Sequence, residues 1–183
     1  MTRTGLARGP LALAVALPLL LAVVVAVIAL STPDVPDPNE PETGPLDVGT
    51  VAAPDAGSRS CVSVLDAVNG FMPSDRGVLA PRRVEPPVVG VRAWAAAPAP
   101  VVLRCGVPRP AELVPSSPLL VVNGVSWLPL PGAAGPPDST TYAAVDREVY
   151  LTVSAPSAAG SGPLQRVSDA ITASLQQKPV RVR

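Results

Sequence analysis

Two cysteines, Cys61 and Cys105, are the residues whose type and spacing most clearly predict chemistry in this sequence. A cysteine pair can form a structural disulfide, remain as two buried thiols, or act as a redox couple. The spacing differs from the Cys-x-x-Cys pattern of redox enzymes. A bond between the two would close a loop of about 45 residues, which stabilises a domain by roughly 4 kcal/mol in the chain-entropy model. We favour a structural disulfide, with the other two possibilities left open.

Three further side chains are candidate contacts for a ligand or a partner, namely Trp94, Arg104 and Trp127. The tryptophans could line a binding groove, but aromatic residues make up only 3% of the chain, so both are also candidates for core anchors. Arg104 could bind an anion or pair with an acid inside the fold. The neighbouring pair Arg82-Arg83 is expected to be solvated.

Carboxylates and glycines offer weaker signals. Asp146 and Glu148 could act as an acid–base pair or bind a cation, but their place beside a predicted turn favours solvated charges. Gly160-Ser161-Gly162 matches neither a phosphate-binding loop nor a nucleophile elbow, and a glycine-flanked helix start explains it.

Composition excludes several classes of site. Histidine is absent, which removes the commonest general base and metal ligand. Two cysteines without histidine cannot supply the four ligands of a structural zinc site. The formal net charge is zero, which argues against a nucleic-acid partner. We therefore predict no catalytic, cofactor-binding or metal-binding residues, and a non-enzymatic role is favoured.

The elements that must position the cysteines can be read from the apolar pattern. Residues 101–107 alternate as a strand, with Cys105 in the apolar row and a proline at each end. Residues 60–72 predict a helix with one apolar stripe, formed by Cys61, Val64, Leu65, Val68 and Phe71. Both sulfur atoms should therefore face the core.

The remaining pattern completes an α+β domain. A strand is expected over 88–94 after a loop over 74–87, and Asn123-Gly124 predicts a hairpin between two apolar runs. A second hairpin pairs residues 140–145 with 148–154, and residues 163–177 predict a closing helix. The expected fold is a mostly antiparallel sheet of five to six strands with one helix before it and one after it.

The N-terminus predicts a single transmembrane helix over residues 10–30. Leu11 to Leu30 contains no charged residue and would span roughly 30 Å as a helix, the thickness of a bilayer core. Arg3 and Arg8 precede it, so the positive-inside rule puts residues 1–9 in the cytoplasm and residues 59–183 outside. A cleaved signal peptide is the alternative, and would make the protein secreted.

Residues 31–58 are rich in proline and acidic residues and contain no aromatic side chain. Such a segment buries little apolar surface, so we expect a disordered linker between the anchor and the domain.

The chain resembles an actinobacterial membrane-protein family known as domain of unknown function 3515. The resemblance rests on VVLRCGVPRP around Arg104-Cys105-Gly106, the upstream Cys61 helix, VNGVSWL at 122–128 and GPLQRVSDAI at 162–171. It implies an envelope protein with no assigned activity. Together these observations predict a membrane-anchored, extracytoplasmic protein that binds or organises a component of the cell envelope. The alternatives are an envelope hydrolase acting through carboxylates or Ser/Thr, and a redox-sensing pair.

Overall fold

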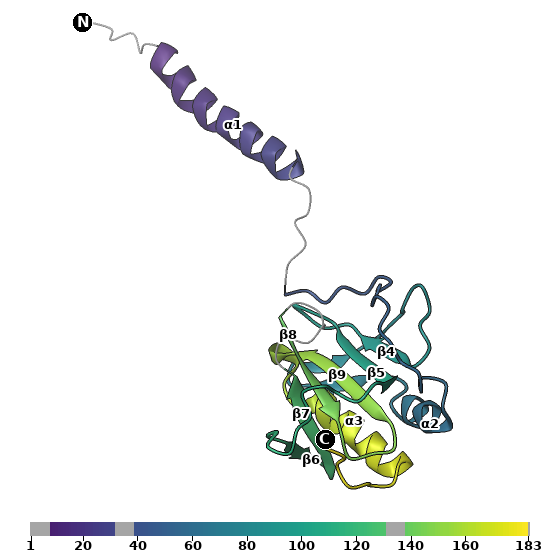
Figure 1. Ribbon diagram of the computed structural model, residues 1–183. Helices are drawn as coiled ribbons and strands as arrows, with labels where there is room; N and C mark the ends of the chain where they lie inside the picture. The colour runs from purple at the N-terminus through teal and green to yellow at the C-terminus, as the bar shows by residue number, and fades with distance from the viewer. Residues whose placement is uncertain (1–7, 32–38, 131–137, 183) are drawn as a thin grey trace, which may run out of the picture. The chain divides into compact units, whose positions relative to one another are not determined.

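The computed structural model describes residues 8–31, 39–130 and 138–182 (Figure 1). The chain divides into two compact units, residues 1–37 and 38–183. The first contains a single helix in its described part, and the second contains the sheet and the remaining described helices.

Helix α1, Arg8–Ser31, runs for 24 residues and includes Pro18. Large apolar side chains in its described part are exposed, such as Leu20 at 69% and Leu30 at 88%. Within the described ranges, no helix combines the length and the apolarity needed to cross a membrane. The transmembrane role of residues 10–30 stays a prediction.

The second unit is an α+β domain, as predicted. Its described elements in chain order are α2 (Arg59–Ala67), β1 (Met72–Ser74), β2 (Gly77–Leu79), β3 (Pro81–Arg82), β4 (Val91–Trp94), β5 (Val101–Val107), β6 (Leu120–Val122), β7 (Val125–Leu130), β8 (Ser139–Ala144), β9 (Tyr150–Pro156), the 3₁₀ helix η1 (Ser157–Ala159) and α3 (Gly162–Ser174).

Strands β3 to β9 form one sheet in the order β3-β4-β5-β9-β8-β7-β6, with every neighbouring pair antiparallel. The sheet has seven strands, where the sequence predicted five or six. The additional edge strand, β3, lies in the segment predicted as a loop. Its two residues are too few to show an alternating pattern, and pairing of Pro81 with Trp94 places it beside β4.

Both predicted helices of this unit form, but each is shorter than its apolar stripe suggested. Helix α2 stops at Ala67 because Gly70 takes a φ of 96° and Met72 already belongs to β1. Helix α3 ends at Ser174 because Leu175 adopts an extended conformation. The predicted Asn123-Gly124 hairpin is confirmed, with φ values of 45° and 78° at the two turn residues.

Helices α2 and α3 pack against each other, and their apolar faces join the main core on one face of the sheet. That core includes Cys61, Cys105, Trp94 and Trp127. The opposite face carries two smaller clusters, one around Val91, Ala93 and Val102 and the other around Leu113, Leu128 and Val145. Helices α2 and α3 therefore meet the start of β9 on the helix side of the sheet.

Residues 32–38 of the expected linker, 31–58, lie outside the described residues, and the second half of the linker differs from the prediction. Residues 42–56, which we name the strap, lie against the domain. The prediction that Arg82 is solvated is wrong, because the strap covers it: Arg82 is 8% exposed, pairs with Glu42 at 2.9 Å and donates from Nε to the Gly44 carbonyl at 2.7 Å. Leu46 forms a parallel bridge with Val84. The sequence could not show this, because the strap is held mainly through its backbone by partners far along the chain.

Candidate functional site

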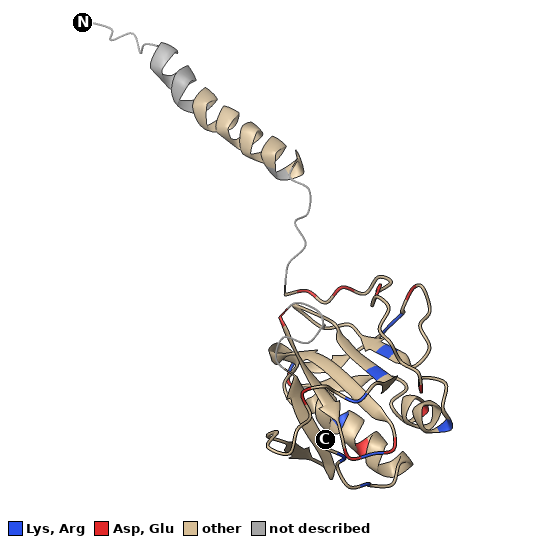
Figure 2. Cartoon of the chain, in the orientation of Figure 1, with Lys and Arg blue, Asp and Glu red and all other residues tan. Residues whose placement is uncertain are grey.

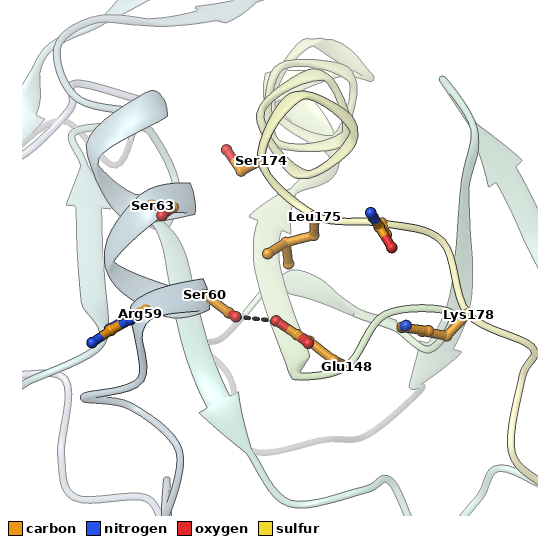
Figure 3. Close-up of a pocket in the computed structure, with 8 residues that line it drawn as sticks. Arg59, Ser60, Ser63, Glu148, Ser174, Leu175 and Lys178 are labelled. Atoms are coloured by element: carbon orange, nitrogen blue, oxygen red, sulfur yellow. Dashed lines mark hydrogen bonds between the residues drawn. The ribbon is translucent and has the colours of Figure 1, made fainter.

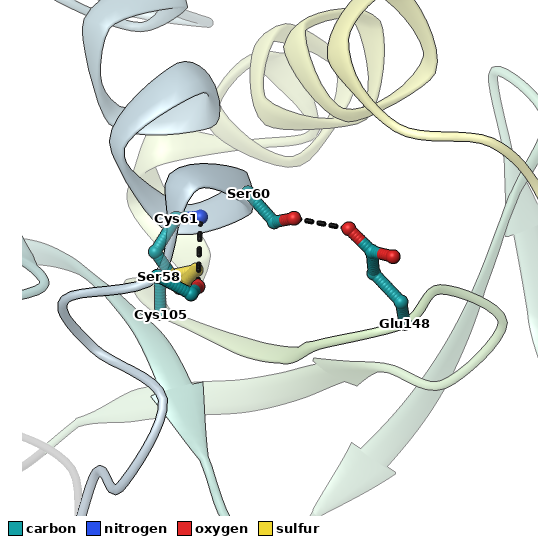
Figure 4. Close-up of a disulfide and its surroundings, with 5 residues drawn as sticks. All are labelled: Ser58, Ser60, Cys61, Cys105 and Glu148. Carbon is teal, nitrogen blue, oxygen red and sulfur yellow. Dashed lines mark hydrogen bonds between the residues drawn. A yellow bond between two sulfur atoms is a disulfide. The ribbon is translucent and has the colours of Figure 1, made fainter.

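Cys61 and Cys105 form the predicted disulfide, with their Cα atoms 5.5 Å apart (Figure 4). Both residues are fully buried in the main core. The bond joins the first turn of α2 to the central part of β5, so it fixes where α2 begins relative to the sheet.

Two serines shortly before Cys61, Ser58 and Ser60, have different partners. Ser58 caps α2 by accepting a hydrogen bond from the Cys61 backbone N–H at 3.3 Å. Ser60 turns the other way and donates its hydroxyl hydrogen to Oε1 of Glu148, which lies in the turn before β9 (Figure 4). The start of α2 is therefore tied to the sheet both covalently and by a hydrogen bond.

The Ser60–Glu148 contact lies in a cavity of ≈ 260 Å³, which we call the Ser60 cavity. Its lining comes from the first turns of α2, the end of α3 with the residues that follow it, and the turn before β9 (Figure 3). The eight lining residues are Arg59, Ser60, Ser63, Glu148, Ser174, Leu175, Gln176 and Lys178.

Most polar groups in this lining lack a protein partner. Within the described part of the chain, the side chains of Ser63, Ser174, Gln176 and Lys178 form no hydrogen bond or ion pair. Glu148 uses one carboxylate oxygen to accept from Ser60 and forms no ion pair with any described residue. The cavity thus presents free hydroxyls, an amide and both signs of charge to solvent.

The cavity does not belong to a larger surface patch of a single charge. Figure 2 shows that Lys/Arg and Asp/Glu positions are scattered over the described part of the second unit rather than gathered in one run of a single sign. Arg59 points away from Ser60 and Glu148, whereas Lys178 directs its ammonium group toward the Glu148 side (Figure 3). Glu148 and Lys178 are therefore the charges that a molecule in the cavity would meet.

A buried ion pair supports the wall that carries Lys178. Arg147 Nη1 lies 2.8 Å from Asp146 Oδ1, with side chains only 2% and 1% exposed. Asp146 also accepts from the Ser126 N–H at 3.0 Å through Oδ2 and from the Lys178 N–H at 2.9 Å through its backbone carbonyl. The sequence predicted solvated charges for Asp146 and Glu148; this holds for Glu148 but is wrong for Asp146, whose local partners are brought together by the fold.

Trp94 and Trp127 are core anchors, which is the structural role considered for them from the sequence. Trp94 is 1% exposed and donates from Nε1 to the Gly70 carbonyl at 2.8 Å. Trp127 is fully buried and donates from Nε1 to Ser168 Oγ at 2.9 Å. Neither indole lines the Ser60 cavity.

Arg104 lies on the opposite face of the sheet from the Ser60 cavity. Its Nη2 donates to the backbone carbonyl of Val48 in the strap, and burial lowers the pKa of the guanidinium by desolvation. Val91 lies directly opposite Arg104 on β4. This placement gives Arg104 a structural contact, and it does not bring Arg104 together with the residues of the cavity.

Sequence reasoning missed Ser60 and Lys178 as residues of a site. Lys178 is the only lysine in the chain, which is the single signal that could have drawn attention to it. Ser60 begins the helix predicted over residues 60–72, and it was assigned no role in a site from the sequence. Among the described residues, no group of three or more cysteine, aspartate or glutamate side chains is placed to hold a metal ion.

A family model described as "Protein of unknown function (DUF3515)" matches residues 13–180. No curated protein and no solved structure matches the chain. The match spans α1 from residue 13 onward, the strap, and the elements that build the Ser60 cavity.

Proposed function

The chain belongs to the DUF3515 family of proteins of unknown function, and from that premise we propose that it is a membrane-anchored envelope protein. Its second unit lies outside the cytoplasm and binds an envelope component non-covalently in the Ser60 cavity. The observation that carries the binding role is a polar cavity in which four side chains lack a protein partner within the described chain, namely Ser63, Ser174, Gln176 and Lys178.

The N-terminal sequence supports an anchor. Leu11 to Leu30 contains no charge, it falls within helix α1, and leucines and valines in the described part of that helix are exposed. An apolar surface of this kind is stable in lipid and unfavourable in water. Arg3 and Arg8 precede the run, which favours a cytoplasmic N-terminus.

The disulfide supports an oxidising location for the second unit. Disulfides persist outside the cytoplasm and are rare within it, where thiols are kept reduced. Cys61 and Cys105 are the only cysteines of the chain, so no other thiol competes for either one. Intact-mass analysis of the native protein, with and without reductant, tests this point and also reports any cleavage of the anchor.

Site-specific crosslinking in cells tests the binding function. A photo-reactive amino acid at position 63 replaces a free hydroxyl that lines the cavity, whereas the same group at position 66 sits on α2 outside the lining. We expect a crosslinked envelope component from position 63 but not from position 66, and loss of that product when Lys178→Gln is added. Equal yields from both positions, or no dependence on Lys178, would refute the proposal.

A hydrolase is the second candidate, favoured by the Ser60–Glu148 contact alone. Glu148 accepts the Ser60 hydroxyl hydrogen, as a general base accepts the proton of a nucleophile. No third described residue orients Glu148, although such a group completes most nucleophile–base pairs. A fluorophosphonate probe distinguishes the two functions: labelling at Ser60, lost in Ser60→Ala, supports hydrolysis, and absence of labelling supports binding.

The redox alternative is disfavoured by burial. Both cysteines are 0% exposed, so a reducing partner has no direct access to either sulfur in the folded state. We expect a reduction potential below about −300 mV, as for structural disulfides, and a higher value would revive a redox role.

A further inference from the structure

We propose that the Ser60 cavity binds a zwitterionic α-amino acid centre, meaning an ammonium and a carboxylate on one carbon. The centre belongs to a free amino acid or to the end of a longer side chain in an envelope component. This inference rests on the binding function proposed above and specifies the chemistry of its ligand.

Three charged residues line the cavity, but Arg59 points away from Ser60 and Glu148 (Figure 3), so Glu148 and Lys178 determine the class of ligand. Glu148 and Lys178 both line the cavity, yet they form no ion pair with each other (Figure 3). A purely anionic ligand would be repelled by Glu148, and a purely cationic ligand by Lys178. A neutral ligand with both charges satisfies both side chains, with its ammonium at Glu148 and its carboxylate at Lys178.

The uncharged groups of the lining complete this pattern. Ser63, Ser174 and Gln176 have side chains that no described residue engages, and they can donate to a carboxylate or accept from an ammonium. Leu175, 8% exposed, supplies a small apolar surface for the carbon skeleton between the two charges. None of the lining residues is aromatic, so the cavity lacks a flat face on which a sugar ring could stack.

The size of the cavity also favours a small ligand. Its volume of ≈ 260 Å³ falls below the roughly 300–1,000 Å³ of pockets that hold drug-sized molecules. One amino acid centre with a short side chain suits this space, whereas a disaccharide or a nucleotide does not.

The walls of the cavity are fixed before any ligand arrives. The Cys61–Cys105 disulfide holds the Ser60 side, and the backbone hydrogen bond from Lys178 to Asp146 holds the other. Leu175 is fixed by its own N–H, which donates to the Ile171 carbonyl at 2.8 Å. Preorganisation of this kind lowers the entropic cost of binding, which matters for a ligand with few atoms.

Calorimetric titration of the full chain in detergent tests the proposal. The probes are D- and L-alanine, alaninamide, which lacks the carboxylate, N-acetylalanine, which lacks the ammonium, and N-acetylglucosamine. We expect one alanine enantiomer or both to bind, and each single-charge probe to bind at least about tenfold more weakly. Glu148→Gln and Lys178→Gln should each weaken alanine binding by about the same factor.

Control variants remove the same charges elsewhere on the surface. Glu112 and Arg76 are exposed and lie outside the cavity, so Glu112→Gln and Arg76→Gln should leave alanine binding unchanged.

A further probe distinguishes a free amino acid from an amino acid centre at the end of a longer side chain. The probe is 2,6-diaminoheptanedioic acid, which has two amino acid centres, with one of them chemically blocked. Tighter binding than alanine indicates a centre carried on a side chain, and equal or weaker binding indicates a free amino acid.

Three results would overturn the ligand class. These are no alanine binding, alaninamide or N-acetylalanine binding as tightly as alanine, and N-acetylglucosamine binding that is lost in Lys178→Gln. If crosslinking from position 63 still succeeds in those cases, only the zwitterionic ligand is refuted and the binding function stands. If crosslinking from position 63 fails as well, both the zwitterionic ligand and the binding function are refuted.

Discussion

Ser60 donates its hydroxyl hydrogen to Glu148, 88 residues further along the chain, and so joins the first turn of α2 to the turn before β9. The disulfide of the next residue, Cys61, links the same turn of α2 to β5. Two strands that neighbour each other in the sheet, β5 and β9, are therefore both connected to one helix end. This arrangement places the Ser60 hydroxyl and the Glu148 carboxylate in the lining of the same cavity.

Loss of the disulfide should destabilise the second unit. Cys61 and Cys105 are 44 residues apart, and a loop of this length contributes roughly 4 kcal/mol in the chain-entropy model. We expect the free energy of unfolding, measured by urea denaturation, to fall by about that amount on reduction. The Cys61→Ser/Cys105→Ser double variant should show the lower stability with or without reductant. Unfolding that is insensitive to reductant in the native chain would contradict the structural role.

Substitution of Ser58 and of Ser60 by alanine should lower the unfolding free energy by different amounts. Ser58→Ala removes the cap of α2 and should cost about 1 kcal/mol of unfolding free energy. Ser60→Ala removes a hydrogen bond between exposed groups, so its cost should be less than about 0.5 kcal/mol. Thermal and urea unfolding of the two variants measure this difference. A larger loss in Ser60→Ala would show that the contact with Glu148 is mainly structural.

The buried pair Asp146–Arg147 should contribute far more than the exposed pair Arg83–Glu85. Asp146→Asn leaves the guanidinium of Arg147 buried without its counter-charge, which typically costs about 3–5 kcal/mol. Glu85→Gln breaks an ion pair of 3.8 Å between side chains 77% and 50% exposed, so its effect should stay within about 0.5 kcal/mol. Urea denaturation measures both, and similar losses would contradict the assigned burial.

Gly106→Ala should release the strap. A Cβ atom at this position would lie 2.2 Å from the backbone nitrogen of Ala56, at a residue whose φ is +81°. Gly77→Ala is the matched control, because its φ is also positive, +111°, but no atom lies within 4 Å of the added Cβ. We expect faster hydrogen exchange over residues 42–56 in Gly106→Ala only. Equal exchange in both variants would mean that close packing at Gly106 does not hold the strap.

Much of the fold could be predicted because its signals are local. Asn123-Gly124 specifies a turn by its own backbone preferences, and the apolar alternation around Cys105 marks a buried strand. The cysteine pairing could be predicted because the helix pattern around Cys61 and the strand pattern around Cys105 both direct their sulfur atoms to the core. These features need no knowledge of distant partners.

The site and the strap could not be predicted for the opposite reason. Ser60 and Glu148 become neighbours only through the sheet order, and Lys178 reaches the cavity because Asp146 holds its backbone. Residues 42–56 look like a solvated linker by composition, since their stabilising partners, Arg82, Gly90 and Gly106, lie elsewhere in the chain. The composition of a segment indicates how much apolar surface its own side chains can bury. It does not indicate which backbone contacts the segment makes with distant parts of the chain.

The sheet order has a consequence for how the nascent chain matures. Strand β9, Tyr150–Pro156, is the last of the described strands to be synthesised, yet it lies at the centre of the sheet between β5 and β8. Strands β3 to β5 and β6 to β8 are thus two separate ribbons until β9 is inserted, whereas both cysteines are already available. We expect a chain truncated before Tyr150 to form the Cys61–Cys105 bond under oxidising conditions but to unfold without a cooperative transition. A cooperative transition in that truncated chain would refute this order of maturation, in which covalent closure precedes completion of the sheet.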